Sequence, residues 1–339
     1  MKIILLAADI YENGVHGYNQ EWESRDSLKI LQNELSSLGY LVILKENPIE
    51  VFQFLTENAE PNKKKDIIVF NLVEGYSSRN REAYIPALCE YLGFCHTGSD
   101  AYAQILSLDK FLLKQVVSKL GIPTANSYLW KREHHESLDS LDINQVKFPI
   151  FIKPNGEGSS LGVTKDNIIQ NRTELESISA KLFLKYDQLI VEEYIDGFDV
   201  TIGLSGEKNS YQLSEPARVK YDGEVYSEDI KSKSHMPESL VFDLEKSLSD
   251  LIKHYSQNIA EHLEISGPAR FDYMISNRTI YFLELNLTPG LSKIYSLFPK
   301  LFEHSGVSYS DTLELILRSA ESNFRHSKRF DYGKGLHLI

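Results

Sequence analysis

A stretch in the C-terminal third of the chain carries residue types that phosphate chemistry requires. Residues 267–297 are GPARFDYMISNRTIYFLELNLTPGLSKIYSL, and alternating apolar residues flank a turn at residues 276–278. This pattern predicts a β-hairpin in which Asp272 lies across from Glu284 and Asn286. Two carboxylates and an amide oxygen are hard ligands that suit Mg²⁺, which takes its other ligands from water and phosphate.

Two further groups in this stretch could bind negative charge next to the metal ion. The guanidinium of Arg270 and the backbone amide of Gly290 could stabilise an oxyanion beside the ion. The competing interpretation is a hairpin with a solvated acidic face, because short motifs often match by chance. The choice between the two therefore depends on the other segments of the chain.

A glycine-rich loop is the second candidate for phosphate binding. Residues 154–162 are PNGEGSSLG, and the backbone amides of such a loop can fold over phosphates. The spacing matches neither a Walker loop nor the dinucleotide fingerprint. Lys153 ends an apolar strand just before the loop, and a lysine there needs an anionic partner such as a nucleotide phosphate. A simple glycine-rich hairpin turn remains the alternative.

The segment after the next apolar strand could hold the rest of a nucleotide. The strand expected at 188–193 ends in Glu192-Glu-Tyr-Ile195, and a turn then leads to Asp199. Glu192 and the backbone of Ile195 could lie along an adenine edge. The carboxylate of Asp199 could accept hydrogen bonds from ribose hydroxyls.

The N-terminal part alternates predicted strands and helices, which is typical of a parallel sheet covered on both faces. Ligands of such sheets bind beyond the carboxyl ends of the strands. We therefore expect functional residues in the loops after the first and third strands. These loops contain Glu21, Glu23, Ser24, Asn71, Glu74 and Gly75. The expected strands are 1–8, 41–44, 66–72 and 94–97, and the expected helices are 23–38, 49–58 and 81–92.

The remainder of the chain predicts two further α+β units. A helix at 108–120 carries Lys110 and Lys114, and the strand expected at 148–153 starts a small unit with a helix at 173–185. Residues 215–235 are polar and charged, so we expect a mobile loop there. Helices are predicted at 240–263 and 311–318. The expected domains are residues 1–99, 100–205 and 206–339.

Composition excludes several classes of function. The 339 residues carry a formal net charge of −12, which argues against nucleic acid and against anionic membrane surfaces as partners. No stretch approaches the roughly 18 apolar residues of a membrane span. The N-terminal MKIILLAADIY predicts a first buried strand. Cys89 and Cys95 fit neither a zinc pattern nor a disulfide framework, so we expect a cytoplasmic protein.

Taken together, these motifs resemble those of the ATP-grasp ligases, and among them the D-alanine–D-alanine ligase group. The motifs occur in family order over nearly the whole chain: Lys110 in SLDKFLLK, KPNGEGSSLG from Lys153, EEYI with Asp199, RFD from Arg270, and ELNLTPG up to Gly290. The resemblance implies an α/β (α+β) ATP-grasp fold with an N-terminal parallel-sheet domain, a small central domain and a C-terminal domain that carries the metal site.

The resemblance also implies roles for these residues. ATP would lie between the central and C-terminal domains, with its phosphates on Lys110, Lys153 and the loop Glu157-Gly158-Ser159-Ser160. Glu192 and Ile195 would face adenine, and Asp199 would face ribose. Two Mg²⁺ ions, with Mn²⁺ as an alternative, would bind Asp272, Glu284 and Asn286. A carboxylate would form an acyl phosphate that an amine then attacks, with Arg270 and the Gly290 amide stabilising the oxyanion. A homodimer is a further expectation from the family.

Three departures from the family pattern lie where the amino acids would bind. The His-Gly…Gly-Glu-Asp-Gly segment is replaced by FNLVEG at residues 70–75. The Lys-Tyr pair expected in the mobile loop aligns with Lys231, but Ser232 follows it, while Lys220-Tyr221 lies earlier. The segment after Gly290 is one residue longer than usual, which leaves Ser292 and Ser296 as alternatives for holding a substrate carboxylate.

These observations favour an ATP-dependent ligase that joins an amino-acid carboxylate to an amine. Glu23, chosen over Glu21, would hold the ammonium of the first amino acid, with Ser159 nearby and Lys231 on a phosphate. Authentic D-alanine–D-alanine synthesis is the narrow alternative. A non-catalytic ATP-binding regulatory module is the alternative from another class, although it would need no oxyanion donor. A purely structural protein would not bind ATP at all.

Overall fold

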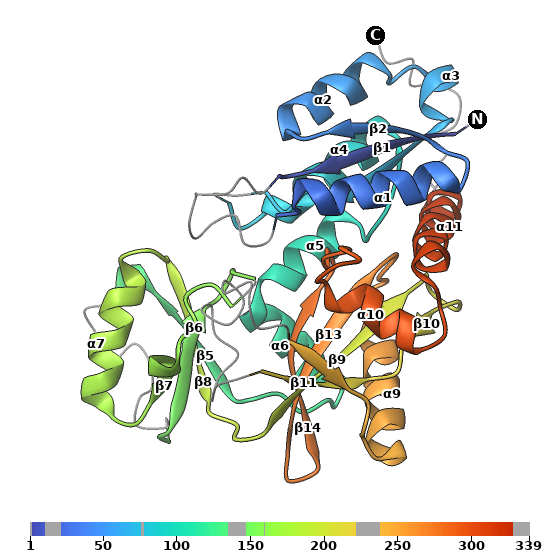
Figure 1. Cartoon of the computed structure of the whole chain (residues 1–339). Coiled ribbons are helices and arrows are strands. Elements are labelled where there is room, and N and C mark those ends of the chain that lie inside the picture. The colour runs from blue at the N-terminus through green and yellow to red at the C-terminus, as the bar shows by residue number, and fades with distance from the viewer. Residues whose placement is uncertain are drawn as a thin grey trace.

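The chain folds around three β-sheets in the computed structural model (Figure 1). The structure describes residues 2–10, 22–75, 78–134, 147–158, 160–221 and 238–327. Within these ranges no helix has the length and apolar character needed to cross a membrane.

The N-terminal sheet is parallel, in the strand order β2-β1-β3-β4, as the alternation of strands and helices predicted. Its side chains divide between two cores, because successive residues of a strand point to opposite faces. Ile4 and Leu6 of β1 pack toward α1, whereas Leu5 and Ala7 pack toward α2 and α4. The elements are β1 (Ile3–Ala8), α1 (Arg25–Ser37), β2 (Leu41–Lys45), α2 (Pro48–Glu57), α3 (Pro61–Lys64), β3 (Ile67–Leu72), η1 (Arg81–Ala83), α4 (Tyr84–Leu92) and β4 (Cys95–His96).

The segment after this sheet contains two helices where the sequence predicted one. Helix α5 (Ala101–Leu108) and helix α6 (Lys110–Lys119) are separated by Asp109. The Asp109 carboxylate accepts a hydrogen bond from the backbone N–H of Leu112 and so caps α6. The break makes Lys110 the first residue of α6.

The central sheet is antiparallel, in the order β5-β8-β6-β7, and α7 covers one face. Its core joins Leu175 and Phe183 of α7 to Trp130 and Ile152 of the strands. The predicted strands at 148–153 and 188–193 and the predicted helix are confirmed, whereas β5 was not predicted. The elements are β5 (Ser127–Lys131), η2 (Arg132–His134), β6 (Ile150–Pro154), η5 (Lys165–Asn167), β7 (Ile168–Ile169), α7 (Arg172–Phe183) and β8 (Gln188–Glu193).

The third sheet is antiparallel, in the order β12-β11-β9-β13-β14, with β10 also paired to β9. Strand β9 lies near its centre and before the expected boundary at residue 206. Helices α5, α6 and α9 contribute to its core, and α10 packs where Gly203 of β9 leaves room for Phe302. Helix α11 lies beside α1 and joins this part to the N-terminal sheet (Figure 1).

The elements of this part are β9 (Phe198–Ser205), β10 (Gln212–Leu213), β11 (Ala217–Lys220), β12 (Ser239–Val241), α9 (Lys246–His262), β13 (Ala269–Ser276), β14 (Thr279–Asn286), α10 (Leu297–His304) and α11 (Tyr309–Ser327). The predicted hairpin is confirmed as β13 and β14. The loop expected at 215–235 begins instead with strand β11, and its residues 222–235 lie outside the described ranges. Strands β10 and β12 and helix α10 were not predicted.

Candidate active site

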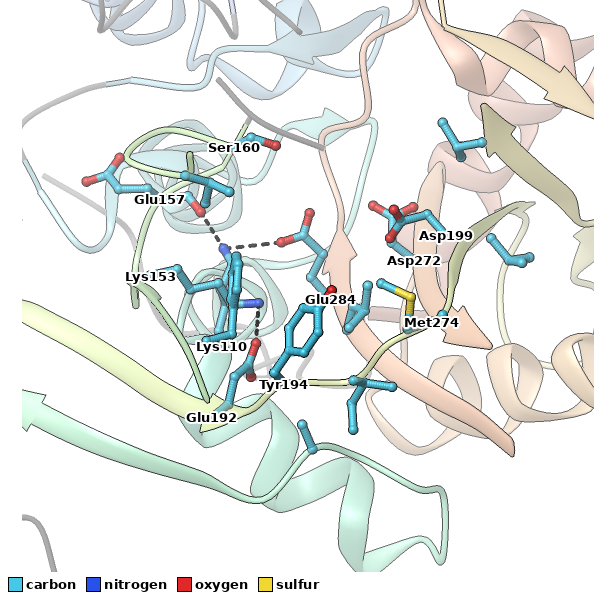
Figure 2. Close-up of a pocket in the computed structure, with 18 of the residues that line it drawn as sticks. Lys110, Lys153, Glu157, Ser160, Glu192, Tyr194, Asp199, Asp272, Met274 and Glu284 are labelled. Atoms are coloured by element: carbon cyan, nitrogen blue, oxygen red, sulfur yellow. Dashed lines mark hydrogen bonds and ion pairs between the residues drawn. The ribbon is translucent and has the colours of Figure 1, made fainter. Parts of the chain in front are cut away.

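A first cavity opens between the central sheet and the hairpin β13–β14 (Figure 2). Its volume is about 170 Å³. Apolar side chains of Phe151, Tyr194, Met274 and Leu283 form part of its wall and were not predicted from sequence. The predicted residues that line it are Lys110, Lys153, Glu157, Ser160, Glu192, Ile195, Asp199, Arg270, Asp272 and Glu284.

Two buried lysines share one buried glutamate at the edge of this cavity. Oε1 of Glu192 lies 2.8 Å from Nζ of Lys153, and Oε2 of Glu192 accepts a hydrogen bond from Lys114. Burial lowers the pKa of Lys114 to about 8, although Glu192 acts in the opposite direction. Burial alone would raise the pKa of Glu192, but Lys114 and Lys153 lower it to about 2. Glu192 is therefore ionised and fixes both ammonium groups.

This network changes the roles inferred from sequence. A lysine at the end of a buried strand was expected to need an anionic partner. Within the protein, the partner of Lys153 is Glu192. Glu192 lines the cavity, but both of its oxygens are bonded to lysines. Lys114 was noted only as a second lysine on the helix. Its position one helical turn after Lys110 was the available signal that both point to one face.

Lys110 connects the glycine-rich loop to the hairpin. Its Nζ donates a hydrogen bond to the backbone carbonyl of Glu157 and lies 3.4 Å from Oε2 of Glu284 (Figure 2). The loop itself turns tightly, since Ser160 has a φ of 57°. Gly162 has a φ of 73°, and a Cβ there would meet Pro154 at 2.8 Å, so glycine is required at this position. Ser159 lies outside the described residues.

Asp199 lies on β9, across the cavity from Lys153. Its Oδ2 accepts a hydrogen bond from the hydroxyl of Tyr221, a residue that the sequence did not assign to this cavity. Burial raises the pKa of Asp199 to about 6, and the carboxylates of Asp272 and Glu284 act in the same direction. A group at this position could accept hydrogen bonds from a ribose, as the sequence predicted, once it is ionised.

The hairpin aligns the candidate metal ligands as the sequence predicted. Asp272 pairs with Glu284, and Arg270 pairs with Asn286. Arg270 donates to Oδ2 of Asp272 at 2.8 Å, and Nδ2 of Asn286 lies 3.1 Å from the same oxygen. Thr201 donates to Oδ1 of Asp272 at 2.7 Å.

This donor set fits a magnesium ion that is also held by phosphate. No three histidine, cysteine, aspartate or glutamate side chains converge as metal ligands among the described residues. Two carboxylates and an amide oxygen instead leave positions for phosphate and water, which is the usual coordination of Mg²⁺ in nucleotide sites. The amide of Asn286 would turn its oxygen toward the ion, because its nitrogen now faces Asp272.

A second cavity adjoins the first. It measures about 200 Å³ and shares Lys110, Arg270, Glu284 and Leu297 with the first cavity. It extends from this shared boundary toward the loops of the N-terminal sheet. Further lining residues are Glu23, Glu74, Gly158, Asn286, Gly290 and Ser296, together with Trp22, Glu82, Thr288 and Tyr295, which were not predicted.

Glu23 is buried at one end of the second cavity, before the start of α1. The Ser24 side chain caps α1 by accepting from the backbone N–H of Ser27, and the Ser27 hydroxyl donates to Oε2 of Glu23 at 2.6 Å. The loops after β1 and β3 are joined, because the backbone N–H of Gly75 donates to Asp9 at 2.8 Å. Glu21 and Lys231 lie outside the described residues.

The two serines in the segment after Gly290 have different surroundings. Ser292 is buried, and its hydroxyl accepts from the backbone N–H of Ile294 at 3.2 Å, so it stabilises the turn. Ser296 lines the second cavity and directly precedes α10. A Cβ on Gly290 would lie 2.7 Å from the Ser296 hydroxyl, so a larger residue there would displace that hydroxyl.

Comparisons with known proteins agree with this architecture. The family model described as "D-ala D-ala ligase C-terminus" matches residues 116–318. The D-alanine–D-alanine ligase of Coprothermobacter proteolyticus is 30% identical over 248 residues, covering 72% of this chain and 80% of that protein. The chain belongs to the D-alanine–D-alanine ligase family. The enzyme of Pelagibacter ubique is 29% identical over 306 residues, covering 88% of this chain and 94% of its own.

Solved structures of the family share the fold. The ligase of Bacillus anthracis, crystallised with ATP, superposes with a TM-score of 0.74 at 20% identity, over 96% of this chain and 100% of that one. The VanG D-Ala:D-Ser ligase of Enterococcus faecalis gives a TM-score of 0.75 at 19% identity, over 94% of this chain and 99% of its own. The expected ATP-grasp fold is therefore confirmed. The family assignment also makes the chain an ATP-dependent, ADP-forming ligase that uses a divalent metal.

Proposed function

We propose that this protein uses ATP and Mg²⁺ to phosphorylate the carboxylate of an amino acid and then joins that acid to an amine. The observation that carries the proposal is the contact between the two cavities. They meet at Lys110, Arg270 and Glu284, beside the metal-ligand pair Asp272–Glu284. A γ-phosphate entering from the first cavity would meet a carboxylate entering from the second at this boundary.

The charged residues of the first cavity would bind and orient ATP. Lys110 and Lys153 would bind its phosphates, and Glu192 would hold Lys153 in place. Ile195 would face adenine and Asp199 the ribose, with the apolar wall packed on the base. Bound Mg²⁺ would be held by Asp272, Glu284 and Asn286 and would neutralise phosphate charge. We infer two such ions, with Mn²⁺ as a substitute.

The residues of the second cavity would position the amino acid and the attacking amine. Glu23, which lines this cavity, would bind the ammonium group of the first substrate. Ser159 would act at the same substrate. The amine would attack the acyl phosphate, and phosphate would leave. Arg270 and the Gly290 amide would stabilise the oxyanion of the tetrahedral intermediate, and Lys231 would contact the transferred phosphate.

The substrate pair is expected to differ from two D-alanines. The names of the relatives cover D-Ala–D-Ala and D-Ala:D-Ser ligases, so the family accepts variation at the second position. Two of the departures from the family pattern have residues in the second cavity, namely Glu74 of segment 70–75 and Tyr295 and Ser296 of the segment after Gly290. Authentic D-alanine–D-alanine synthesis remains the alternative.

A phosphate-release screen tests the proposal. Pairs of D- and L-amino acids and simple amines would be assayed with ATP and Mg²⁺, and products would be identified by mass spectrometry. We expect some acid–amine pair to release phosphate faster than D-alanine alone at millimolar concentration. If D-alanine alone is the best substrate and yields D-alanyl-D-alanine, the substrate prediction is wrong. If no pair releases phosphate while ATP still binds, the non-catalytic ATP-binding module is the better account.

We further propose that the protein works in the cytoplasm. Cys89 and Cys95 are both buried and are not joined to each other by a disulfide, which supports a reducing cytoplasm. Small-molecule substrates, rather than nucleic acid or a membrane surface, remain the proposed partners. A homodimer is proposed from the family alone, and sedimentation would test it.

A further inference from the structure

Glu23 joins two segments that lie at opposite ends of the sequence. It is only 5% exposed. Its Oε2 accepts hydrogen bonds from the Ser27 hydroxyl at 2.6 Å and from the Tyr295 hydroxyl at 2.9 Å. Its Oε1 accepts from the backbone N–H of Leu291 at 3.2 Å. The carboxylate is therefore held by α1 on one side and by the segment 291–296 on the other.

The Tyr295 hydroxyl is bonded on both sides. It donates its proton to Glu23, and its oxygen accepts from the backbone N–H of Ser24 at 3.3 Å. Burial and the nearby Glu23 carboxylate raise the pKa of Tyr295, so the phenol keeps its proton near neutral pH. Tyr295 thus ties Ser24, the N-cap residue of α1, to the carboxylate of the residue before it.

These contacts leave one edge of the carboxylate for a ligand. A carboxylate oxygen has two lone-pair positions, and Ser27 and Tyr295 together occupy those of Oε2. Leu291 occupies one position of Oε1. Oε1 lies 3.9 Å from where a Cβ of Gly290 would stand, so it faces the oxyanion side of the second cavity.

We propose that Tyr295 is a positioning residue that sets amino-acid specificity, because it fixes Glu23 so that Oε1 receives the substrate ammonium beside Gly290. This inference rests on the proposed function, since it assigns the ammonium site of that reaction. Tyr295 acts through Glu23 and through no direct contact with the reacting atoms.

The departures in sequence agree with this assignment. Ser232 stands where the family resemblance implies a tyrosine near the glutamate and the first amino acid. Tyr295 reaches the same glutamate from the segment that is one residue longer than usual. That segment is anchored at both ends, because the Leu291 carbonyl accepts from the Tyr309 hydroxyl at 2.9 Å and the Tyr295 carbonyl accepts from Lys300 at 3.2 Å. The phenol is therefore supplied from a fixed part of the C-terminal domain.

The test compares Tyr295→Phe with wild type and with Tyr309→Phe. Both variants lose one hydroxyl that holds the same segment, but the Tyr309 hydroxyl donates to the Leu291 carbonyl rather than to Glu23. The side chain of Tyr295 is half exposed, so its loss of a hydroxyl should leave the melting temperature nearly unchanged. Steady-state phosphate release would give kcat and both KM values, and calorimetry would give binding of D-alanine and of D-lactate, its hydroxy analogue.

Tyr295→Phe should raise the amino-acid KM about tenfold, the scale of one hydrogen bond to a charged group. The KM for ATP should stay within about twofold. The affinity for D-lactate should fall less than that for D-alanine, because its neutral hydroxyl bonds to a carboxylate more weakly than an ammonium does. Tyr309→Phe should leave the amino-acid KM near that of wild type. An unchanged KM in Tyr295→Phe, an equal rise in Tyr309→Phe, or an equal loss with D-lactate would overturn the assignment.

The two proposals can fail separately. If wild type binds D-alanine in a Tyr295-dependent way but releases no phosphate with any pair, the proposed function is wrong and this assignment stands. If wild type turns over and Tyr295→Phe matches it in every constant, only this assignment is wrong. If wild type neither turns over nor binds any amino acid tested, both are wrong.

Discussion

In the first cavity, charged side chains from α6, β6 and β8 pair with one another, and one glutamate fixes two lysines. In the second cavity, Glu23 is fixed by neutral donors, namely two hydroxyls and one backbone amide, which come from both ends of the chain. Under the proposed function, the cations of the first cavity would bind a polyanion. The carboxylate of the second would bind an ammonium group.

The two cavities differ in how their charged groups are held. The cations of the first cavity depend on contacts among α6, β6 and β8. The second cavity depends on how α1 meets the segment before α10. Tyr295 of that segment bonds to Glu23 and does not line the first cavity, so a change at this position should alter the second cavity and leave the first intact.

The proposed metal ligands lie where the two cavities adjoin, so their loss should impair the reaction that we place there. Asp272→Ala or Glu284→Ala should lower turnover by at least about a thousandfold, because metal ligation supplies several kcal/mol of charge stabilisation. The fold should persist, since Phe271, Tyr273 and Ile275 pack on the opposite face of β13. Phosphate release with circular dichroism would measure both effects.

The matched control for the metal prediction is Asp243→Ala. This exposed carboxylate pairs with Arg218 at 3.3 Å in the same part of the fold. It should retain wild-type turnover. Near wild-type turnover in Asp272→Ala or Glu284→Ala would show that the hairpin does not hold the ion.

Loss of Lys153 should weaken ligand binding in the first cavity and leave binding in the second unchanged. Lys153→Ala should weaken ATP binding by roughly 1.5–3 kcal/mol, the scale of a hydrogen bond to a charged group. Amino-acid binding should not change, because Lys153 does not line the second cavity. Calorimetry with each ligand would measure this, with Lys131→Ala on β5 as the exposed control in the same sheet. Unchanged ATP affinity would remove Lys153 from the phosphate site.

Substitution of Asp199 should give the smallest effect. This effect is a change in how the stability of the fold depends on pH. Burial raises its pKa from 3.8 to about 6 in the folded protein. A carboxyl with a raised folded pKa stabilises the fold at low pH, and this contribution is lost as the pH rises toward 6. Asp199→Asn should therefore raise the melting temperature, relative to wild type, more at about pH 7.5 than at about pH 4.5.

Asp196→Asn, in the exposed turn before β9, is the matched control for Asp199. Thermal denaturation of both variants and of wild type at the two pH values would give the comparison. An equal difference between Asp199→Asn and wild type at both values would contradict the assigned burial effect.

The sequence predicted the parts of the fold that depend on local pattern. The alternation and the turn predicted the hairpin, but a regular register would place Leu283 opposite Asp272. A register shift between Asp272 and Tyr273 brings Glu284 opposite Asp272. The parallel sheet followed from the alternation of strands and helices. The helix predicted at 108–120 corresponds to α6, whereas α5 before Asp109 was not predicted.

Contacts between distant segments could not be predicted in this way. Glu192 was assigned to adenine because it ends a strand, while its partner Lys114 lies on a helix from an earlier part of the chain. Tyr295 was part of a segment whose register was open, and only packing of α10 and α1 brings its hydroxyl to Glu23. Pairings of this kind depend on tertiary structure, which propensity and spacing do not determine.

Under the proposed function, ATP phosphorylates a substrate carboxylate where the two cavities meet. The most direct test supplies an amino acid whose carboxylate oxygens are isotopically heavy, together with ATP, Mg²⁺ and the amine found by the phosphate-release screen. Mass spectrometry of the released phosphate then follows the label. Our account predicts that each phosphate carries one heavy oxygen from the carboxylate. Released phosphate without any heavy oxygen would contradict it, because no bond between the carboxylate and phosphorus would then have formed.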